Sequence, residues 1–399
     1  MTFKRMALMV LILALLAPVL AACGSTATTA ATTAGTTAAT TAATTTAAAG
    51  GTIKIGGLAP LTGDVSVYGI AAANAIKLAI SEINKAGGVL GKQIEYIVYD
   101  EKGDATEAVT AYNKLVEQDK VIAIIGDITS KPTIAVAKLA AKINLPMISP
   151  TATALDVTAQ GPSIFRACFI DPFQGKVMAA FAGESLKAKK VAVIYNSGDD
   201  YSVGLADAFK AEAKARGIEV VADESYSKGD TDFKAQLTKI GSAKPDALFV
   251  PDYYNTVALI ANQAKSLGFT APLLGADGWD GVLTVAKKEE VEGYYFCNHY
   301  SSEDQDPIVQ SFLKNYKDTY NMEANALAAL GYDATYILAE AIKKAGSTDS
   351  AAIVAALNAT DYTGVTGNVK YDADRNPSKS VAITKLVDGK YTFFSKVAP

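Results

Sequence analysis

Short apolar runs alternate with longer amphipathic stretches along most of the chain. The first run, 53–59, is followed by a Gly-punctuated loop and then by Ile76, Ile80 and Ile83, whose spacing places them on one face of a helix. Gly87 supplies a helix stop. The pattern therefore begins as a strand, a loop and an amphipathic helix.

The same alternation continues in two series separated by a less regular stretch. The strands predicted in the first series are 53–59, 94–99, 121–125 and 145–149, and those in the second are 191–195, 218–221 and 247–250. Amphipathic helices are predicted between them, one introduced by Asp104 and Glu107 in capping-box form and another by Ser130 ahead of Pro132. Three helical patterns and a final set of short strands follow residue 300.

Continuous apolar strands separated by helices indicate parallel sheets that are covered on both faces. The sequence therefore predicts an α/β protein with two doubly wound parallel-sheet lobes. A length of 399 residues agrees with about two domains of roughly 150 residues each.

Composition excludes several classes of protein. The chain has 37 Lys and Arg against 41 Asp and Glu, which gives a net charge of −4. It therefore lacks the excess of basic residues that binds nucleic acid. Three Cys and one His cannot build a disulfide scaffold and leave little for a zinc site or His-dependent catalysis. We expect no cofactor, no metal and no enzymatic activity.

The amino-terminal segment has the features of an export signal. Lys4 and Arg5 precede an apolar run over 7–22, shorter than the roughly 18 to 20 residues of a membrane-spanning helix. The run ends at Cys23 in a sequence like a bacterial lipobox, which predicts a signal peptide over 1–22 and a lipid anchor on Cys23. The Thr- and Ala-rich remainder of 23–50 is predicted to be a flexible linker.

Polar residues follow the strands of the first series directly. Ser130 comes after the third strand, and Thr151 and Thr153 come after the fourth. Ligands of parallel sheets bind beyond the carboxyl ends of the strands, where hydroxyl groups and helix N-terminal amides can hold a carboxylate. The alternative is that Ser130 only caps its helix.

The strand ends of the second series carry an acid and aromatic residues. Tyr201 and Tyr253 follow the strands 191–195 and 247–250, and Asp277 and Trp279 lie in Gly275-Ala-Asp277-Gly-Trp279, which we also take as a strand end. A carboxylate among aromatic rings can pair with an ammonium group while the rings enclose an apolar body. Asp277 as a plain helix cap and Tyr253 as a core residue remain alternatives.

The sequence resembles the branched-chain amino-acid-binding proteins of the periplasmic-binding-protein-like family, which deliver solutes to ABC importers. The resemblance extends from Ile53 to Phe394. It rests on the order and spacing of Ala59-Pro-Leu-Thr-Gly63 with Tyr68-Gly69, Gly87-Gly88, Ile148-Ser-Pro-Thr-Ala-Thr153, Phe165-Arg-Ala-Cys-Phe-Ile-Asp-Pro-Phe-Gln-Gly175, Gly275-Ala-Asp-Gly-Trp279 and Gly331-Tyr-Asp333.

The resemblance implies a type I periplasmic binding protein, or Venus flytrap, with two lobes joined by three crossovers. The crossovers are expected near 165–171, 294–300 and 362–369. Lobe 1 would combine 52–168 with 299–362, and lobe 2 would combine 169–298 with 363–399.

The resemblance also implies roles for individual residues. Ser130 and Thr153 would bind the ligand carboxylate, while the carbonyl of Thr151 together with Thr153 and Asp277 would hold the α-ammonium. The remaining ligand contacts that it implies are Tyr68, Tyr201, Tyr253, Leu327 and, less directly, Trp279. Some relatives have a disulfide in the first lobe that this sequence lacks. Cys168 and Cys297 fall on two expected crossovers, as either a disulfide or two buried thiols.

These expectations describe an exported lipoprotein that captures a neutral, apolar amino acid such as a branched-chain one, most naturally as a monomer. Its partners would be the amino-acid ligand and the subunits of an ABC permease, with membrane contact through the lipid anchor only. An amide, urea or aromatic acid as ligand, and a signalling receptor as partner, remain alternatives. The Gly-x-Ser-x-Gly, His-Glu-x-x-His and Gly-x-Gly-x-x-Gly motifs are absent, so an enzyme is a remote one.

Overall fold

The computed structural model describes residues 51–399. The predicted signal peptide over 1–22, the lipidation site Cys23 and the linker that ends at residue 50 lie outside the described residues.

The first lobe is built on a parallel sheet of five strands. Their order is β2 (Ile94–Asp100), β1 (Ile53–Ala59), β3 (Ala123–Ile125), β4 (Met147–Ser149) and β5 (Ile164–Arg166). All four pairings in this sheet are parallel. The continuous apolar runs of the sequence therefore form buried parallel strands, as predicted.

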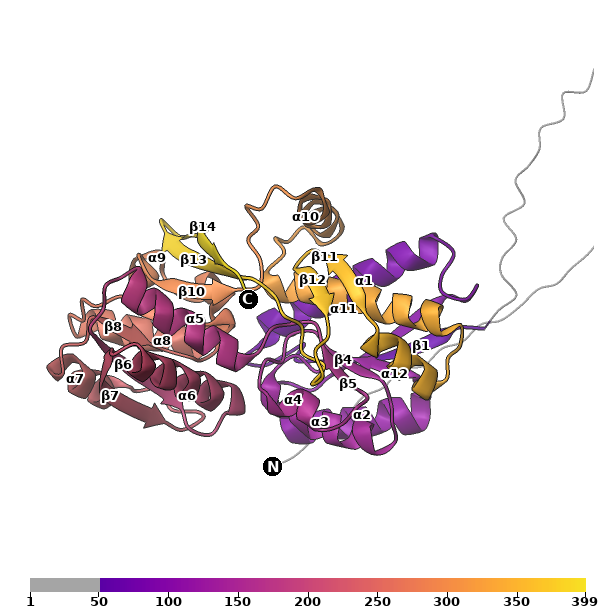
Figure 1. Ribbon diagram of the computed structural model, residues 1–399, viewed down its shortest axis with the longest axis horizontal. Helices are drawn as coiled ribbons and strands as arrows, with labels where there is room; N and C mark the ends of the chain where they lie inside the picture. The colour runs from indigo at the N-terminus through magenta and orange to yellow at the C-terminus, as the bar shows by residue number, and fades with distance from the viewer. Residues whose placement is uncertain (1–50) are drawn as a thin grey trace, which may run out of the picture. The chain divides into compact units, whose positions relative to one another are not determined.

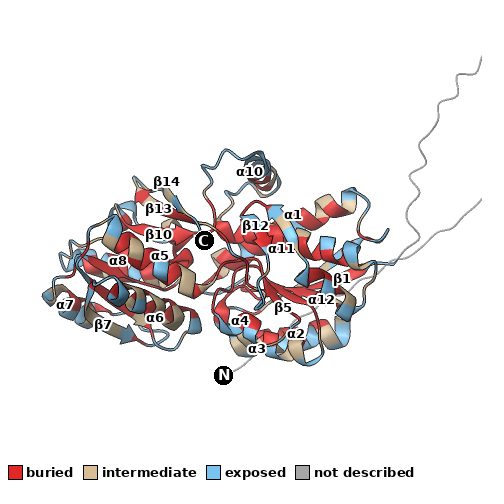
Figure 2. Cartoon of the chain, viewed as in Figure 1, coloured by how far each residue is buried: buried red, intermediate tan, exposed pale blue. Residues whose placement is uncertain are grey.

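Helices cover both faces of this sheet. On one face, apolar residues of α1 (Ser66–Lys85), α11 (Ala326–Ala345) and α12 (Ser350–Asn358) pack against the strands, with Ile76 and Ile337 among them. On the other face lie α2 (Ala105–Lys114), the π-helical turn η1 (Leu115–Asp119), α3 (Ser130–Lys142) and α4 (Asp156–Ala159). Figure 2 shows the labelled β1 and β5 as buried and much of the outer surface of the helices as exposed.

The second lobe is built on a sheet of seven strands. Their order is β14 (Lys390–Val397), β13 (Val381–Val387), β10 (Tyr295–Asn298), β9 (Leu273–Gly275), β8 (Ala247–Phe249), β6 (Lys190–Asn196) and β7 (Glu219–Tyr226). Strands β6 to β10 pair in parallel, but β13 pairs with β10 and β14 in antiparallel fashion. The sheet is therefore mixed, whereas the sequence predicted only parallel pairing.

Helices also cover both faces of the second sheet. The apolar side chains of α5 (Asp171–Glu184) and α6 (Asp200–Ala215) pack on one face, where Phe209 stacks on Phe249 at 4.3 Å between ring centroids. The other face is covered by α7 (Lys234–Ser242) and α8 (Tyr254–Ser266). The short elements η2 (Asp277–Trp279), η3 (Val282–Thr284) and α9 (Lys288–Val291) connect β9 to β10. Figure 1 labels α5, α6, α7, α8 and α9 beside the strands of this lobe.

Three segments carry the chain between the two sheets. The first leads from β5 to α5 and the second from β10 to α10 (Pro307–Tyr320). Residues 362–369, expected to be the third crossover, instead belong largely to a separate hairpin of β11 (Asp361–Gly364) and β12 (Gly367–Lys370). The Asp333 carboxylate accepts from the Val365 and Thr366 amides and so holds the hairpin turn against α11. The chain then joins the second sheet at β13.

Both described cysteines are buried free thiols. The Cys168 Sγ donates to the carbonyl of Ala152 at 3.3 Å, and the Cys297 Sγ donates to Gln174 Oε1 at 3.2 Å. Of the two states that the sequence left open, the structure contains the thiols and not the disulfide.

Candidate functional site

A pocket lies between the carboxyl-terminal ends of the strands of the two sheets. The residues that line it are Tyr68, Ile128, Thr129, Ser130, Thr151, Thr153, Tyr201, Tyr253, Asp277, Gly278 and Leu327. They come from both lobes, and they include every ligand contact named from the sequence except Trp279. Loops that leave parallel strands at the same sheet edge bring these distant residues together.

The first lobe contributes hydroxyl groups and the start of a helix. Helix α3 begins at Ser130 itself, and Thr129 occupies the cap position without a side-chain cap bond. The predicted capping role of Ser130 is therefore wrong, and its Oγ instead accepts from the Ala154 amide at 3.2 Å. The first-turn amides of a helix have no intrahelical acceptor, so this end of α3 favours an anionic group.

The two threonines of the β4–α4 loop present different groups. The Thr151 hydroxyl donates to the carbonyl of Ile128 at 2.5 Å, so its hydrogen is already used within the lobe. The Thr153 carbonyl accepts from the Asp171 amide at 3.1 Å. Burial raises the pKa of Asp171 well above its usual range, and the neighbouring Thr153 side chain opposes that shift.

Arg166 fixes the loop that carries these threonines. Its guanidinium is buried and donates to the carbonyls of Ala152 at 2.9 Å and Ala154 at 2.8 Å, on either side of Thr153. A planar guanidinium that bonds two carbonyls in one loop restrains the backbone between them. The charge of Arg166 is thereby used inside the lobe, and Arg166 does not line the pocket.

The second lobe contributes one carboxylate that is held on both oxygens. Asp277 opens η2, and its side chain is 9% exposed. Its Oδ1 accepts from the Tyr201 hydroxyl at 2.8 Å, and its Oδ2 lies 3.0 Å from His299 Nε2. The Asp277 amide donates to Gln174 Oε1 at 3.0 Å, so the backbone is restrained as well.

Aromatic rings form the remaining wall. Tyr201 and Tyr253 stack at 4.9 Å between centroids, and Tyr68 meets the edge of Tyr253 at 5.9 Å. The Tyr68 hydroxyl donates to the Gly278 carbonyl and accepts from the Tyr254 amide at 3.2 Å, which joins the two lobes. Within the part of the chain that is described, the buried Tyr253 hydroxyl has no hydrogen-bond partner.

Trp279 lies beneath the site and not in its wall. Its ring is fully buried, donates from Nε1 to the Val250 carbonyl at 2.8 Å and packs on Phe296. Gly275 makes this placement possible, because a Cβ there would lie 2.2 Å from the indole ring. The aromatic character of Trp279 therefore supports the fold of the η2 turn.

Several residues of the site were not named from the sequence. Ile128 and Thr129 line the pocket next to Ser130, in a segment whose position after a strand could have identified them. His299 and Gln174 both hydrogen-bond Asp277. Gln174 lies in the Phe165–Gly175 motif and His299 in none, but no spacing connects either of them to Asp277. Their roles depend on contacts between segments that are far apart in the chain.

The pocket is amphoteric. Hydroxyl groups and the N-terminus of α3 form one side, and the Asp277 carboxylate with backbone carbonyls forms the other, while no Lys or Arg is among the lining residues. Nearby Asp280 is used structurally, since it accepts from Asn298 at 3.0 Å and from the Ala326 amide at 2.8 Å, and burial raises its pKa. Such a site suits a small molecule that carries both an anionic and a cationic end.

Over residues 51–399 there is no group of three or more His, Cys, Asp or Glu side chains arranged to hold a metal ion. Over the same residues, no helix has the length and apolar character needed to cross a membrane.

The chain matches the model of a protein family described as periplasmic binding protein, over residues 52–390. It is 34% identical over 304 residues to the Leu/Ile/Val-binding protein BraC3 of Rhizobium johnstonii, a match that covers 76% of this chain and 82% of the relative.

Solved structures are similar over nearly the same region. The leucine binding protein LivK of Thermotoga maritima aligns with a TM-score of 0.83 and 36% identity, covering 87% of this chain and 99% of that one. The branched-chain amino acid transporter substrate binding protein LivJ of Streptococcus pneumoniae, in complex with isoleucine, aligns with a TM-score of 0.83 and 38% identity, covering 87% of this chain and 100% of that one.

Proposed function

Because the chain belongs to the periplasmic binding protein family, we propose that it is the solute-binding component of an ABC importer and that it captures a branched-chain amino acid between its lobes. The amphoteric pocket carries this proposal, since hydroxyl groups face a single carboxylate and no cationic side chain lines the space. A neutral α-amino acid has the matching pair of charges.

The carboxylate of the ligand is assigned to the first lobe. The hydroxyl groups of Ser130 and Thr153 and the N-terminal amides of α3 are the donors that support this assignment. A helix N-terminus favours an anion without a basic side chain.

The ammonium of the ligand is assigned to Asp277, with the backbone carbonyl of Thr151 and with Thr153. Hydrogen bonds from Tyr201 and His299 orient the Asp277 carboxylate before any ligand arrives. A carboxylate that is already oriented lowers the entropic cost of binding the ligand.

The apolar side chain of the ligand is assigned to a wall of Tyr68, Tyr201, Tyr253 and Leu327, which all line the pocket. Ile128 adds a branched aliphatic surface to the same space. Such a wall favours Leu, Ile or Val over polar amino acids, because their burial removes apolar surface from water.

Capture is proposed to work by a shift in population between open and closed forms. The first lobe is taken as 52–168 with 299–370, because the β11–β12 hairpin is held against α11, and the second lobe as 169–298 with 381–399. The permease subunits read the closed form. Ligand contacts to both lobes exist only when these approach each other, so binding energy favours closure. The proposal requires no cofactor, no nucleic acid and no catalytic group, and treats the protein as a monomer.

The family's place outside the cytoplasm agrees with an exported chain. We further assign Cys23 as the lipidated first residue after removal of 1–22, with 23–50 as the tether to the membrane. Membrane contact would then occur through the lipid anchor only.

The test is calorimetric titration of the soluble mature chain, defined as residues 23–399 with Cys23→Ser, after unfolding and refolding to remove carried ligand. Leu, Ile and Val are expected to bind at micromolar or lower concentration. Asp277→Ala is expected to weaken binding by about 2 to 4 kcal/mol, because it leaves the ammonium unpaired in a buried site.

Asp374→Ala removes an exposed carboxylate that does not line the pocket and is the matched control. A loss of less than tenfold in Asp277→Ala would remove Asp277 from the ammonium role. If no amino acid binds but benzoate or a small amide does, the ligand belongs to another chemical class.

A further inference from the structure

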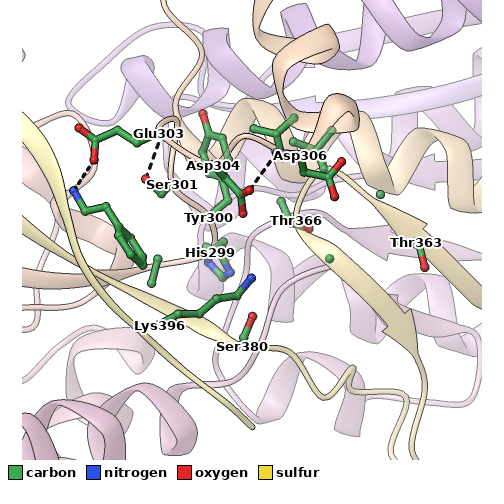
Figure 3. A pocket seen from close by; sticks show the side chains of 16 residues that line it. His299, Tyr300, Ser301, Glu303, Asp304, Asp306, Thr363, Thr366, Ser380 and Lys396 are labelled. Atoms are coloured by element: carbon green, nitrogen blue, oxygen red, sulfur yellow. Dashed lines mark hydrogen bonds between the residues drawn. The ribbon is translucent and has the colours of Figure 1, made fainter.

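A second cavity, of about 310 Å³, lies among the segments that connect the two sheets (Figure 3). Its walls come from the loop before α10, the β11–β12 hairpin, the start of β13 and the end of β14. The side chains that matter here are His299, Glu303, Asp304, Asp306, Ser380 and Lys396. None of these six lines the amino-acid pocket.

His299, the single histidine of the chain, lies between this cavity and the pocket. Its Nε2 is 3.0 Å from Asp277 Oδ2, and its ring stacks on Phe169 at 3.7 Å between centroids. The Nδ1 atom is buried and has no hydrogen-bond partner within residues 51–399. His299 also lines the cavity, where Figure 3 shows it with Lys396 and Ser380.

This contact assigns the proton on the neutral ring. Asp277 Oδ2 is an acceptor, so Nε2 carries the hydrogen and Nδ1 keeps a free lone pair. In this state His299 donates one hydrogen bond but carries no charge. The negative charge of Asp277 can therefore pair with a cation of the ligand. Addition of a proton at Nδ1 creates an imidazolium in direct contact with the same carboxylate.

The charges around the ring come from several elements. Asp277 in η2 and Lys379 ahead of β13 act on the ring directly. Lys396 in β14 and the acids Glu303, Asp304 and Asp306 before α10 line the cavity beside it. Asp171 and Asp280 interact with Asp277 and so affect the ring indirectly. Burial is the main cause that lowers the pKa of His299, and Lys379 lowers it further, while Asp277 raises it. The acids of the loop are partly used, because Asp306 caps α10 and Glu303 accepts from the Phe393 amide.

We infer that His299 is the positioning residue of Asp277 and that its protonation from the second cavity releases the ligand in acid. The neutral ring orients the carboxylate toward the ligand ammonium. The protonated ring forms an ion pair with Asp277 and competes with that ammonium. This inference rests on the proposed function, and it adds a proton to the binding equilibrium.

The sign of the effect follows from linkage. A proton on His299 opposes ligand binding, so bound ligand must lower the pKa of His299 relative to the ligand-free protein. At a pH below the ligand-free pKa, affinity is expected to fall by up to about tenfold for each pH unit, with one proton released per ligand bound.

The first test is nuclear magnetic resonance of the imidazole in the soluble mature chain without a histidine tag, because one histidine gives one set of signals. The nitrogen shifts report the tautomer, and a titration with and without leucine reports the pKa. The expected result is a hydrogen on Nε2 at neutral pH and a lower pKa with leucine. An unchanged pKa on saturation with leucine overturns the inference.

Two variants provide the second test, in which leucine is titrated calorimetrically between pH 8 and 5. His299→Leu removes the donor and is expected to weaken binding about tenfold at neutral pH. His299→Gln can donate without titrating, and is expected to restore most of that loss while removing the acid decline and the proton release. Circular dichroism checks that both variants fold.

The outcomes separate the two proposals. Wild-type protein that binds no amino acid at any pH overturns the proposed function and this inference with it. Wild-type protein that binds leucine, with a pH profile that His299→Gln leaves in place, overturns this inference alone.

Discussion

At the scale of single residues, the molecule separates carboxyl groups that face the pocket from carboxyl groups that support the fold. Asp277 lines the pocket, whereas Glu101 and Asp127 are buried together behind the first lobe's strand ends. Burial raises the pKa of both, and the charge of Asp127 raises the pKa of Glu101 further. The Glu101 Oε1 and Asp127 Oδ2 atoms have no donor partner within residues 51–399, and the two carboxyl groups interact, so one carboxylic proton shared between them would satisfy both.

This pair is expected to make stability fall as pH rises. The unfolded chain loses these protons near pH 4, whereas the folded chain keeps them to higher pH. The folded state therefore binds more protons between those limits, and the free energy of unfolding decreases as pH increases through the raised pKa. Glu101→Gln keeps a hydrogen-bonding group of the same shape and is expected to flatten this decline.

Urea unfolding between pH 5 and 9 measures the effect, with Glu95→Gln as the control at an exposed position of β2. If the free energy of unfolding changes equally with pH in the wild type and in Glu101→Gln, the pair is ionised in both the folded and the unfolded state.

At the scale of elements, short strands end in loops that need their own support. Strands β4 and β5 have three residues each, and the loop after β4 carries Thr151 and Thr153. Arg166, at the end of β5, bonds the carbonyls of that loop in place of regular secondary structure. The neighbouring strand thus determines the geometry of the ligand site.

Arg166→Met is expected to reduce the free energy of unfolding by about 2 to 4 kcal/mol, because buried carbonyls lose their donors. Hydrogen exchange in the loop should accelerate, and the affinity for leucine should fall. Arg216→Met is the control, since Arg216 makes only partly exposed ion pairs with Glu184 and Glu212 and should cost less than about 1 kcal/mol. Equal losses in the two variants would show that the Arg166 bonds do not restrain the loop.

At the scale of the whole molecule, a few polar contacts join the lobes directly. The Tyr68 hydroxyl bonds Gly278 and Tyr254, the Ala326 amide bonds Asp280, and Lys131 Nζ bonds the Gly198 carbonyl at 2.8 Å. Closure therefore depends on groups that must give up these partners when the lobes separate. Tyr68 is central because it also lines the pocket.

Tyr68→Phe is expected to weaken leucine binding by about 1 to 3 kcal/mol, because the buried Gly278 carbonyl and Tyr254 amide lose their partner. Small-angle scattering should show that closure requires more leucine than in the wild type. Tyr320→Phe is the control, since its hydroxyl bonds Asn74 within the first lobe. Wild-type affinity in Tyr68→Phe would show that this bridge is not part of the closed state.

Much of this organisation could be predicted from the sequence, for local reasons. Ser130, Thr153 and Asp277 were identifiable because each follows an apolar strand, and the loops of parallel strands meet at one sheet edge. The alternation of apolar runs with helical periodicity likewise determined the two α/β lobes, because burial on both faces needs continuous apolar strands.

Tertiary structure alone decided the rest. Trp279 is in the core and His299 beside Asp277 because of which segments pack together, and no local pattern records that. The antiparallel β13 and the β11–β12 hairpin depend in the same way on pairing between distant segments. Periodicity specifies which face of an element is buried, but the partner on that face is chosen by packing of the whole chain.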